Sequence, residues 1–251
     1  MADISSIFLF GGLAVLALGL IHLSNRQRHR SERVNCKILE LKRRVGELED
    51  LIHVVEPLTE SLAVPKLINS EIMELISAVR KLDKNDSSMA NHLGNALSHE
   101  EDLADPTRAP KLYRILKSDA DIARAQYLIS ETARIIQVHR RLNKIDGTTR
   151  KMLLAELRWA HVMVSTLSMV AQGHKSITRG DETRARAYYK NAHHKLVISA
   201  VDDERRPRLV KELEEMIAGE RQIVSPDLMP ETDYNPHTGG SGLEIHSSAS
   251  G

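Results

Sequence analysis

Cysteine, aromatic residues and catalytic motifs are all scarce in this chain of 251 residues. Cys36 is the only cysteine, so no disulfide can form within one chain, and this suits a reducing compartment such as the cytoplasm. Aromatic residues make up 3% of the sequence, which leaves Leu, Ile, Val, Ala and Met to build the core. The sequence contains no phosphate-binding loop, no dinucleotide-binding glycine motif, no His-Glu-x-x-His and no Cys-x-x-Cys. We therefore expect no enzyme activity, no catalytic residue, no metal and no cofactor.

Long apolar runs are also absent, except for one at the N-terminus. Residues 4–21 carry no charge, and as a helix they would extend about 27 Å, close to the thickness of the hydrocarbon core of a bilayer. A cleaved signal peptide has basic residues before its apolar run and small residues at its cleavage site. Here only Asp3 is charged before the run, and the run ends in Leu20-Ile21-His22-Leu23-Ser24. The sequence therefore predicts a transmembrane anchor over residues 4–24.

Basic residues follow this run directly, at Arg26, Arg28, Arg30 and Arg33. Because positive charge is retained on the cytoplasmic side, we expect a single-pass protein of the cytoplasmic (inner) membrane, with its N-terminus outside. The same four arginines are expected to lie at the membrane surface and to attract anionic lipid headgroups, by about 1 kcal/mol each.

A heptad pattern begins within this basic juxtamembrane segment, and the two together occupy residues 25–56. Apolar residues alternate at spacings of four and three: Val34, Ile38, Leu41, Val45, Leu48, Ile52 and Val55. Mostly β-branched residues at the a positions, with leucine at the central d positions, favour a parallel homodimer. Leu51 widens the stripe, as expected if the helix instead packs within its own chain. The pattern leaves both arrangements open.

The rest of the chain divides into three predicted segments. Residues 57–110 form an acidic helical linker region, in which Pro57 and Pro65 interrupt the helix and 87–110 are weakly patterned. Residues 111–224 form an all-helical domain, with helices expected over about 118–143, 149–173 and 208–222. Residues 225–251 are rich in Pro, Gly, Ser and Thr and are predicted to be a disordered tail.

One segment within the helical domain carries small residues at regular offsets. Gly173, Gly180, Ala185, Tyr189 and Ala192 are separated by 7, 5, 4 and 3 residues. With its flanks, about 169–197, this segment resembles one tetratricopeptide repeat, a hairpin of two helices in which small residues permit close approach. Met169, Ser176 and Val197 depart from the family's pattern, and no second unit stands in register. The resemblance implies hairpin packing more than a peptide-binding groove.

Charge is distributed in blocks although the chain as a whole is nearly neutral, at +1. Residues 106–195 carry eighteen Lys or Arg against seven Asp or Glu, so this block has a net charge of +11. Its basic residues are dispersed and no aromatic stacking platform accompanies them, which favours a solvated face over a nucleic-acid surface. The sequence as a whole predicts an all-α, membrane-anchored scaffold or adaptor that binds a protein partner. The alternatives are a membrane-tethered regulator that binds nucleic acid through the basic block, and a sensor of a small ligand.

Overall fold

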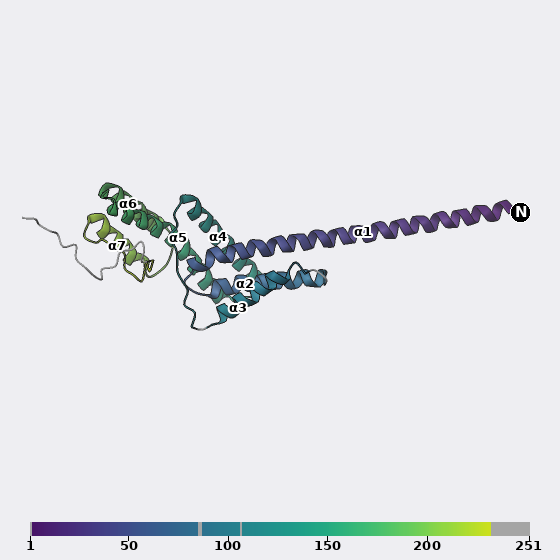
Figure 1. The fold of residues 1–251 in the computed structure, drawn as a ribbon, viewed down its shortest axis with the longest axis horizontal. Coiled ribbons are helices and arrows are strands. Elements are labelled where there is room, and N and C mark those ends of the chain that lie inside the picture. Colours follow the sequence, from purple (N-terminus) through teal and green to yellow (C-terminus); the bar gives the residue numbers. More distant parts are fainter. Residues whose placement is uncertain (1, 85–86, 106, 232–251) are drawn as a thin grey trace, which may run out of the picture. The chain divides into compact units, whose positions relative to one another are not determined.

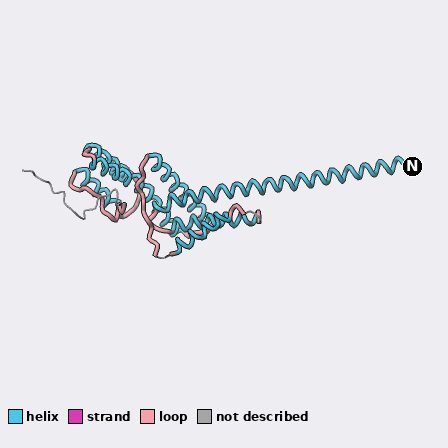
Figure 2. The backbone as a smooth tube through the Cα atoms, in the orientation of Figure 1, coloured by secondary structure: helices cyan, strands magenta, loops and turns pink. Residues whose placement is uncertain are grey.

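The chain folds entirely into helices and loops in the part that the structure, a computed structural model, describes (Figures 1 and 2). The described backbone covers residues 2–84, 87–105 and 107–231, and side chains are described for His22, for Arg26 and from residue 28 onward. The described residues contain seven α-helices, one 3-10 turn and no strand, which confirms the predicted all-α class. In chain order they are α1 (Ala2–Val55), η1 (Glu56–Leu58), α2 (Ala63–Leu82), α3 (Ala90–Ala104), α4 (Asp119–Arg141), α5 (Gly147–Thr178), α6 (Glu182–Ile198) and α7 (Arg206–Ala218).

Helix α1 is continuous over 54 residues and joins the predicted membrane anchor to the predicted heptad helix. No proline occurs between residues 22 and 56, and the Arg, Lys, Glu and Leu of this region favour helix strongly. The anchor itself, 4–24, lies almost wholly among residues whose side chains are outside the described set. A search restricted to what the structure describes finds no helix with the length and hydropathy to cross a bilayer.

The chain divides into two compact units. Unit 1 is Met1–Asp50 with Ile68–Ala104, and unit 2 is Leu51–Leu67 with Asp105–Gly251. Helices α1 and α2 each contribute residues to both units, and the predicted segment bounds stay predictions. The segment 51–67 belongs to unit 2, where Leu51, Val55 and Leu58 are buried.

Unit 1 is held together by an apolar stripe on each helix and by polar contacts between helices. Asn69 of α2 donates to the backbone oxygen of Ala96 in α3 at 2.9 Å, and His92 of α3 lies 2.8 Å from the Glu49 carboxylate of α1. Within the weakly patterned residues 87–110, Ala90–Ala104 is helical. Few apolar residues mark this helix, of which Ala96 and Leu103 are buried.

Unit 2 is built around α5, which packs against α4 on one side and α6 on the other, while α6 also packs against α7 (Figure 1). One apolar face of α5 is buried throughout its length: Leu153, Leu157, Ala160, Val164, Leu167 and Ala171. Trp159 lies in the same core and donates its indole N–H to Glu60 at 3.2 Å. A helix that is apolar on most of its sides is expected at the centre of such a unit.

Helix ends in unit 2 follow from side-chain caps. The Ser118 hydroxyl accepts from the backbone N–H of Asp121 and starts α4. Asp146 accepts from the N–H groups of Thr148 and Thr149, so α5 starts at Gly147, two residues before the predicted start at about 149. Helix α7 ends at Gly219, where φ is +83°, and so stops before residue 222.

Residues 225–231 are packed, so the disordered tail was placed too early. Leu228 and Met229 are buried in the core of unit 2, and Ser225 accepts and donates hydrogen bonds within the same region. These two apolar residues stand among Pro, Ser and Thr in the sequence, so no apolar pattern indicates that they are buried. The remainder of the predicted tail, 232–251, lies outside the described residues.

Candidate functional site

The segment that resembles a tetratricopeptide repeat forms a hairpin of α5 and α6. Gly180 has φ of +78°, in the left-handed region where glycine is favoured, and its N–H bonds to the Ile177 carbonyl at 2.8 Å. Asp181 follows and caps α6 by accepting from the N–H of Arg184 at 2.9 Å. The turn between the two helices is therefore short, and α6 folds back against α5.

Small residues in this hairpin surround the ring of Tyr189, which is 5% exposed. A Cβ atom on Gly173 would lie 2.7 Å from Cδ1 of that ring and closer still to Cε1, so only glycine fits there without movement. Ala185 and Ala192 are fully buried on the same face of α6. The geometry is that of a packing contact, and the tyrosine is not an exposed anchor for a partner.

Enlarging Ala185 should destabilise this contact. Because its side chain is completely buried, Ala185→Leu is expected to lower the free energy of unfolding by about 1–3 kcal/mol through overpacking. Chemical denaturation followed by the fluorescence of Trp159 measures this change. Arg186→Leu is the matched control, since Arg186 is the exposed neighbour on the same helix, and it should leave stability nearly unchanged.

His174 lies beside Tyr189 and has no charge partner. Its Nδ1 atom is 3.2 Å from the Tyr189 hydroxyl, and its Nε2 atom is buried without a hydrogen bond among the described residues. Burial lowers the pKa of His174 from 6.5 to about 4. Burial also raises the pKa of Tyr189 to about 12, so the hydroxyl stays protonated and is available to donate to Nδ1.

This histidine should make unit 2 less stable in acid. The unfolded chain takes up a proton at His174 near pH 6.5, whereas the folded chain does so only near pH 4. Stability should therefore be full above pH 6.5 and fall as the pH decreases through this window, by about 3 kcal/mol in total. Unfolding curves of the wild type and of His174→Gln, measured across the window, isolate this contribution. Equal slopes in the two proteins would contradict it.

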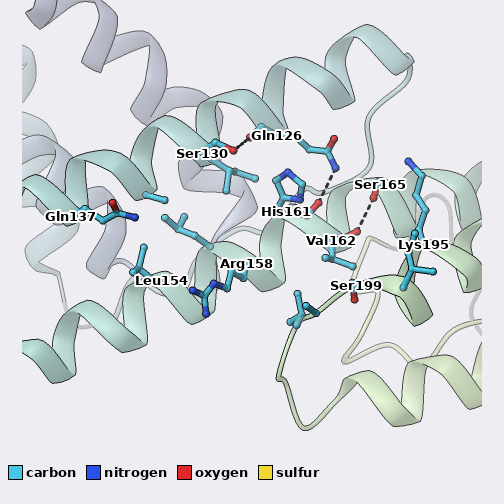
Figure 3. Close-up of a pocket in the computed structure, with 16 residues that line it drawn as sticks. Gln126, Ser130, Gln137, Leu154, Arg158, His161, Val162, Ser165, Lys195 and Ser199 are labelled. Atoms are coloured by element: carbon cyan, nitrogen blue, oxygen red, sulfur yellow. Dashed lines mark hydrogen bonds between the residues drawn. The ribbon is translucent and has the colours of Figure 1, made fainter.

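A groove in unit 2 lies between α4 and α5 and is closed at one end by the end of α6 and the residues after it (Figure 3). Its volume is about 900 Å³. The sixteen residues that line it come from these three elements: Gln126, Ile129, Ser130, Ala133, Gln137, Leu154, Leu157, Arg158, His161, Val162, Ser165, Lys195, Ile198, Ser199, Ala200 and Val201. Its size is within the range of ligand-binding sites, and its walls are mainly apolar.

Among the described residues that line the groove, the basic side chains are the only charged groups. Arg158 and His161 stand on α5 and Lys195 on α6, and none of the lining residues is an Asp or a Glu. Arg158 and Lys195 are exposed and form no ion pair with any carboxylate that the structure describes. The groove therefore offers positive charge beside apolar walls, which suits an anionic group attached to an apolar body.

His161 is a titratable group on the α5 wall of the groove. Its ring is half-buried, and its pKa is lowered from the usual value, first by burial and then by repulsion from Lys195. Its backbone oxygen accepts a hydrogen bond from the side-chain amide of Gln126 at 3.1 Å, which ties α4 to α5 at this point (Figure 3). A carboxylate placed beside His161 would favour the protonated imidazole and so raise the pKa of this histidine.

No motif in the sequence indicates this groove directly. Ala133 of α4 is half-buried and lines the groove. The polar residues Gln126, Ser130 and Gln137 recur along one edge of α4. Any solvated helix face carries polar residues at this spacing, so they do not distinguish a groove.

The predicted self-association stripe is largely buried within one chain. Ile38, Val45 and Leu48 are buried in unit 1, and Ile52 and Val55 in unit 2. Val34 and Leu41 are half-buried. Leu51, which widens the stripe, is buried as well, as the intramolecular arrangement requires. The parallel homodimer stays a prediction.

The four predicted membrane-surface residues, Arg26, Arg28, Arg30 and Arg33, are exposed on α1. Cys36, farther along the helix, is also exposed and free. No group of three His, Cys, Asp or Glu side chains is arranged to hold a metal ion within the described part of the chain.

Comparison with known proteins identifies no relative: no family model, no curated protein and no solved structure matches this chain.

Proposed function

We propose that this chain is a scaffold or adaptor, anchored by one span in the cytoplasmic membrane, whose unit 2 holds a protein partner in the groove between α4 and α5. The groove is the observation that carries the proposal. It is open to solvent, mainly apolar, and lined by Arg158, His161 and Lys195 without a compensating carboxylate. Apolar surface left exposed beside unpaired charge is typical of a surface that binds another molecule.

Membrane attachment rests on the sequence. Residues 4–21 are apolar and uncharged, and the exposed arginines from Arg26 to Arg33 follow on the C-terminal side. A cytoplasmic reporter fused after about residue 60 should be active, and a reporter that works only after export should be inactive. Activity of the exported reporter alone, or a mature chain that lacks residues 1–24, would contradict this orientation.

Partner binding can be tested with two alanine variants of α4. Ala133 lines the groove, whereas Ala123 is exposed and does not. The tagged full chain, recovered from native membranes, should bring down a set of partner proteins. The Ala133→Arg variant should no longer bring down these proteins, and the Ala123→Arg variant should. Quantitative mass spectrometry measures the difference. Identical recoveries from the two variants would contradict an adaptor role for the groove.

A sensor of a small ligand is the second candidate, and the size of the groove favours it. A volume of about 900 Å³ would also accept an anionic amphiphile such as a fatty acid. A screen of thermal unfolding with such compounds distinguishes the two functions. A large shift that Ala133→Arg abolishes, without any protein lost from that variant, would favour the sensor.

A further inference from the structure

The two walls of the groove are helix faces, and the space between them can hold a third helix. Residues on each wall are separated by 4, 3 and 4 positions, which is the spacing of one helix face. On α4 these are Gln126, Ser130, Ala133 and Gln137, and on α5 they are Leu154, Arg158, His161 and Ser165. The loop between the two helices is short, so they run antiparallel, and Gln126 bonds to His161 across them. The walls run along each other for about 16 Å, or three turns of helix.

The bottom of the groove is apolar. Ile129, Leu154 and Leu157 are buried beneath it, and Ala133 leaves space at its centre because its side chain is small. Ridges of a third helix fit into such a space, in the way that α-helices pack against one another. An occupant of this shape must carry its own apolar stripe at positions three and four residues apart.

Charge differs between the two walls. The α4 wall presents Gln126, Ser130 and Gln137, which are neutral, whereas Arg158, His161 and Lys195 all stand on the α5 and α6 side. A docked helix with acidic residues along one edge of its apolar stripe would face these three basic groups. Acidic residues along the other edge would face only amides and a hydroxyl. The asymmetry therefore specifies the orientation of the occupant as well as its charge.

From this geometry we infer that the groove binds an amphipathic helix of about three turns from a partner protein, with acidic residues on the edge that faces Arg158, His161 and Lys195. The inference rests on the proposed adaptor function and names the chemistry of its partner.

Binding of the acidic helix is also linked to protonation of His161. The charged groups that line the groove around His161 are Arg158 from α5 and Lys195 from α6, and α4 contributes none. A carboxylate placed against His161 favours its protonated form, so binding should tighten as the pH decreases.

A displayed peptide library tests this directly. Yeast cells would carry helical peptides of about 15 residues, with a fixed leucine stripe and random Asp, Glu, Lys, Arg, Gln or Ser on both flanking edges. The full chain in nanodiscs of uncharged lipid is the bait. We expect enrichment of Asp and Glu on one edge only, with exclusion of Lys and Arg from that edge. Enriched peptides should bind about fivefold more tightly at about pH 6 than at about pH 8, and His161→Asn should remove this difference.

Matched variants determine whether binding occurs in the groove. Ala133→Arg should weaken an enriched peptide at least about tenfold by filling the groove, whereas Ala123→Arg should leave it unchanged. The double variant Arg158→Gln/Lys195→Gln should abolish the preference for acidic residues, and Arg124→Gln/Lys190→Gln, at exposed positions outside the groove, should preserve it. Circular dichroism checks that each variant is folded, and Ser130→Arg, at an exposed wall position, replaces Ala133→Arg if that variant is not.

Several results would overturn the inference. These are enrichment of basic or uncharged edges, no enrichment at all, binding that Ala133→Arg does not weaken, and a dodecanoate-induced thermal shift without any peptide binder. If the library fails while native membranes still lose partners with Ala133→Arg, the adaptor function stands and the acidic helix is wrong. If Ala133→Arg and Ala123→Arg behave alike in both experiments, both proposals fail.

Discussion

Replacing Tyr189 with alanine should lower the free energy of unfolding by about 3–5 kcal/mol, the usual cost of removing a buried aromatic ring. The ring is 5% exposed and lies against Gly173 of α5, so its loss leaves a cavity between α5 and α6. Trp159 is the only tryptophan and belongs to the same core, so its fluorescence reports the unfolding of this unit. Tyr189→Phe is the control: it removes only the hydroxyl bond to His174 and should cost about 1 kcal/mol.

A double-mutant cycle with Gly173 makes the test specific to this contact. Gly173→Ala alone should cost about 1–3 kcal/mol, because the new methyl group overlaps the ring. Once Tyr189 is alanine, the same methyl group enters the space that the ring has left. The double variant should therefore cost clearly less than the sum of the two single variants. Additive costs would mean that Tyr189 does not pack against Gly173.

Replacing Arg114 with methionine should also cost about 3–5 kcal/mol, because it leaves a carboxylate buried without its cation. The Arg114 side chain is 1% exposed. Its guanidinium donates to Glu231 at 3.3 Å, to Glu60 at 3.1 Å and to the Leu228 oxygen at 3.0 Å, so it joins three parts of unit 2 that are far apart in the sequence. Denaturation followed by Trp159 fluorescence measures the loss.

The control for this prediction removes both charges. In Arg114→Met/Glu231→Met no carboxylate is left buried beside residue 114, and two apolar side chains replace the ion pair, so most of the lost stability should return. Glu60 keeps its second partner, Arg205, at 2.7 Å in either variant. If the double variant is as unstable as Arg114→Met, the contribution of Arg114 comes from Leu228 and Glu60 instead of the pair with Glu231.

The helices could be predicted where one residue carries a local signal. Ser118 starts α4 because its hydroxyl caps the Asp121 N–H, and Gly180 ends the first helix of the hairpin because its φ is positive. The close packing at Tyr189 could also be predicted, since small residues at helical spacing beside one aromatic residue permit only a few ways for two helices to pack. In these places the sequence within one turn of helix determines the outcome.

Other features depend on residues far apart in the chain, and no local pattern reveals them. Arg114 looks like one more member of a basic block, but its partners are Glu60 and Glu231. The basic groove likewise needs α4, α5 and the end of α6 to meet, and Arg158 and Lys195 are 37 positions apart in the sequence. The order in residues 225–231 follows from the same fact, because Glu231 and Leu228 hold Arg114.

Photocrosslinking in living cells measures most directly whether a partner occupies the groove while the chain is in its membrane. A photoreactive amino acid placed at Ser130 points from α4 into the groove, and one placed at Ala123 lies on α4 outside it. We expect a discrete crosslinked protein from residue 130 and none from residue 123, recovered in the membrane fraction and lost when Arg158 and Lys195 are changed to glutamine. Equal crosslinking from the two positions, or a product from residue 130 that the two substitutions do not affect, would contradict it.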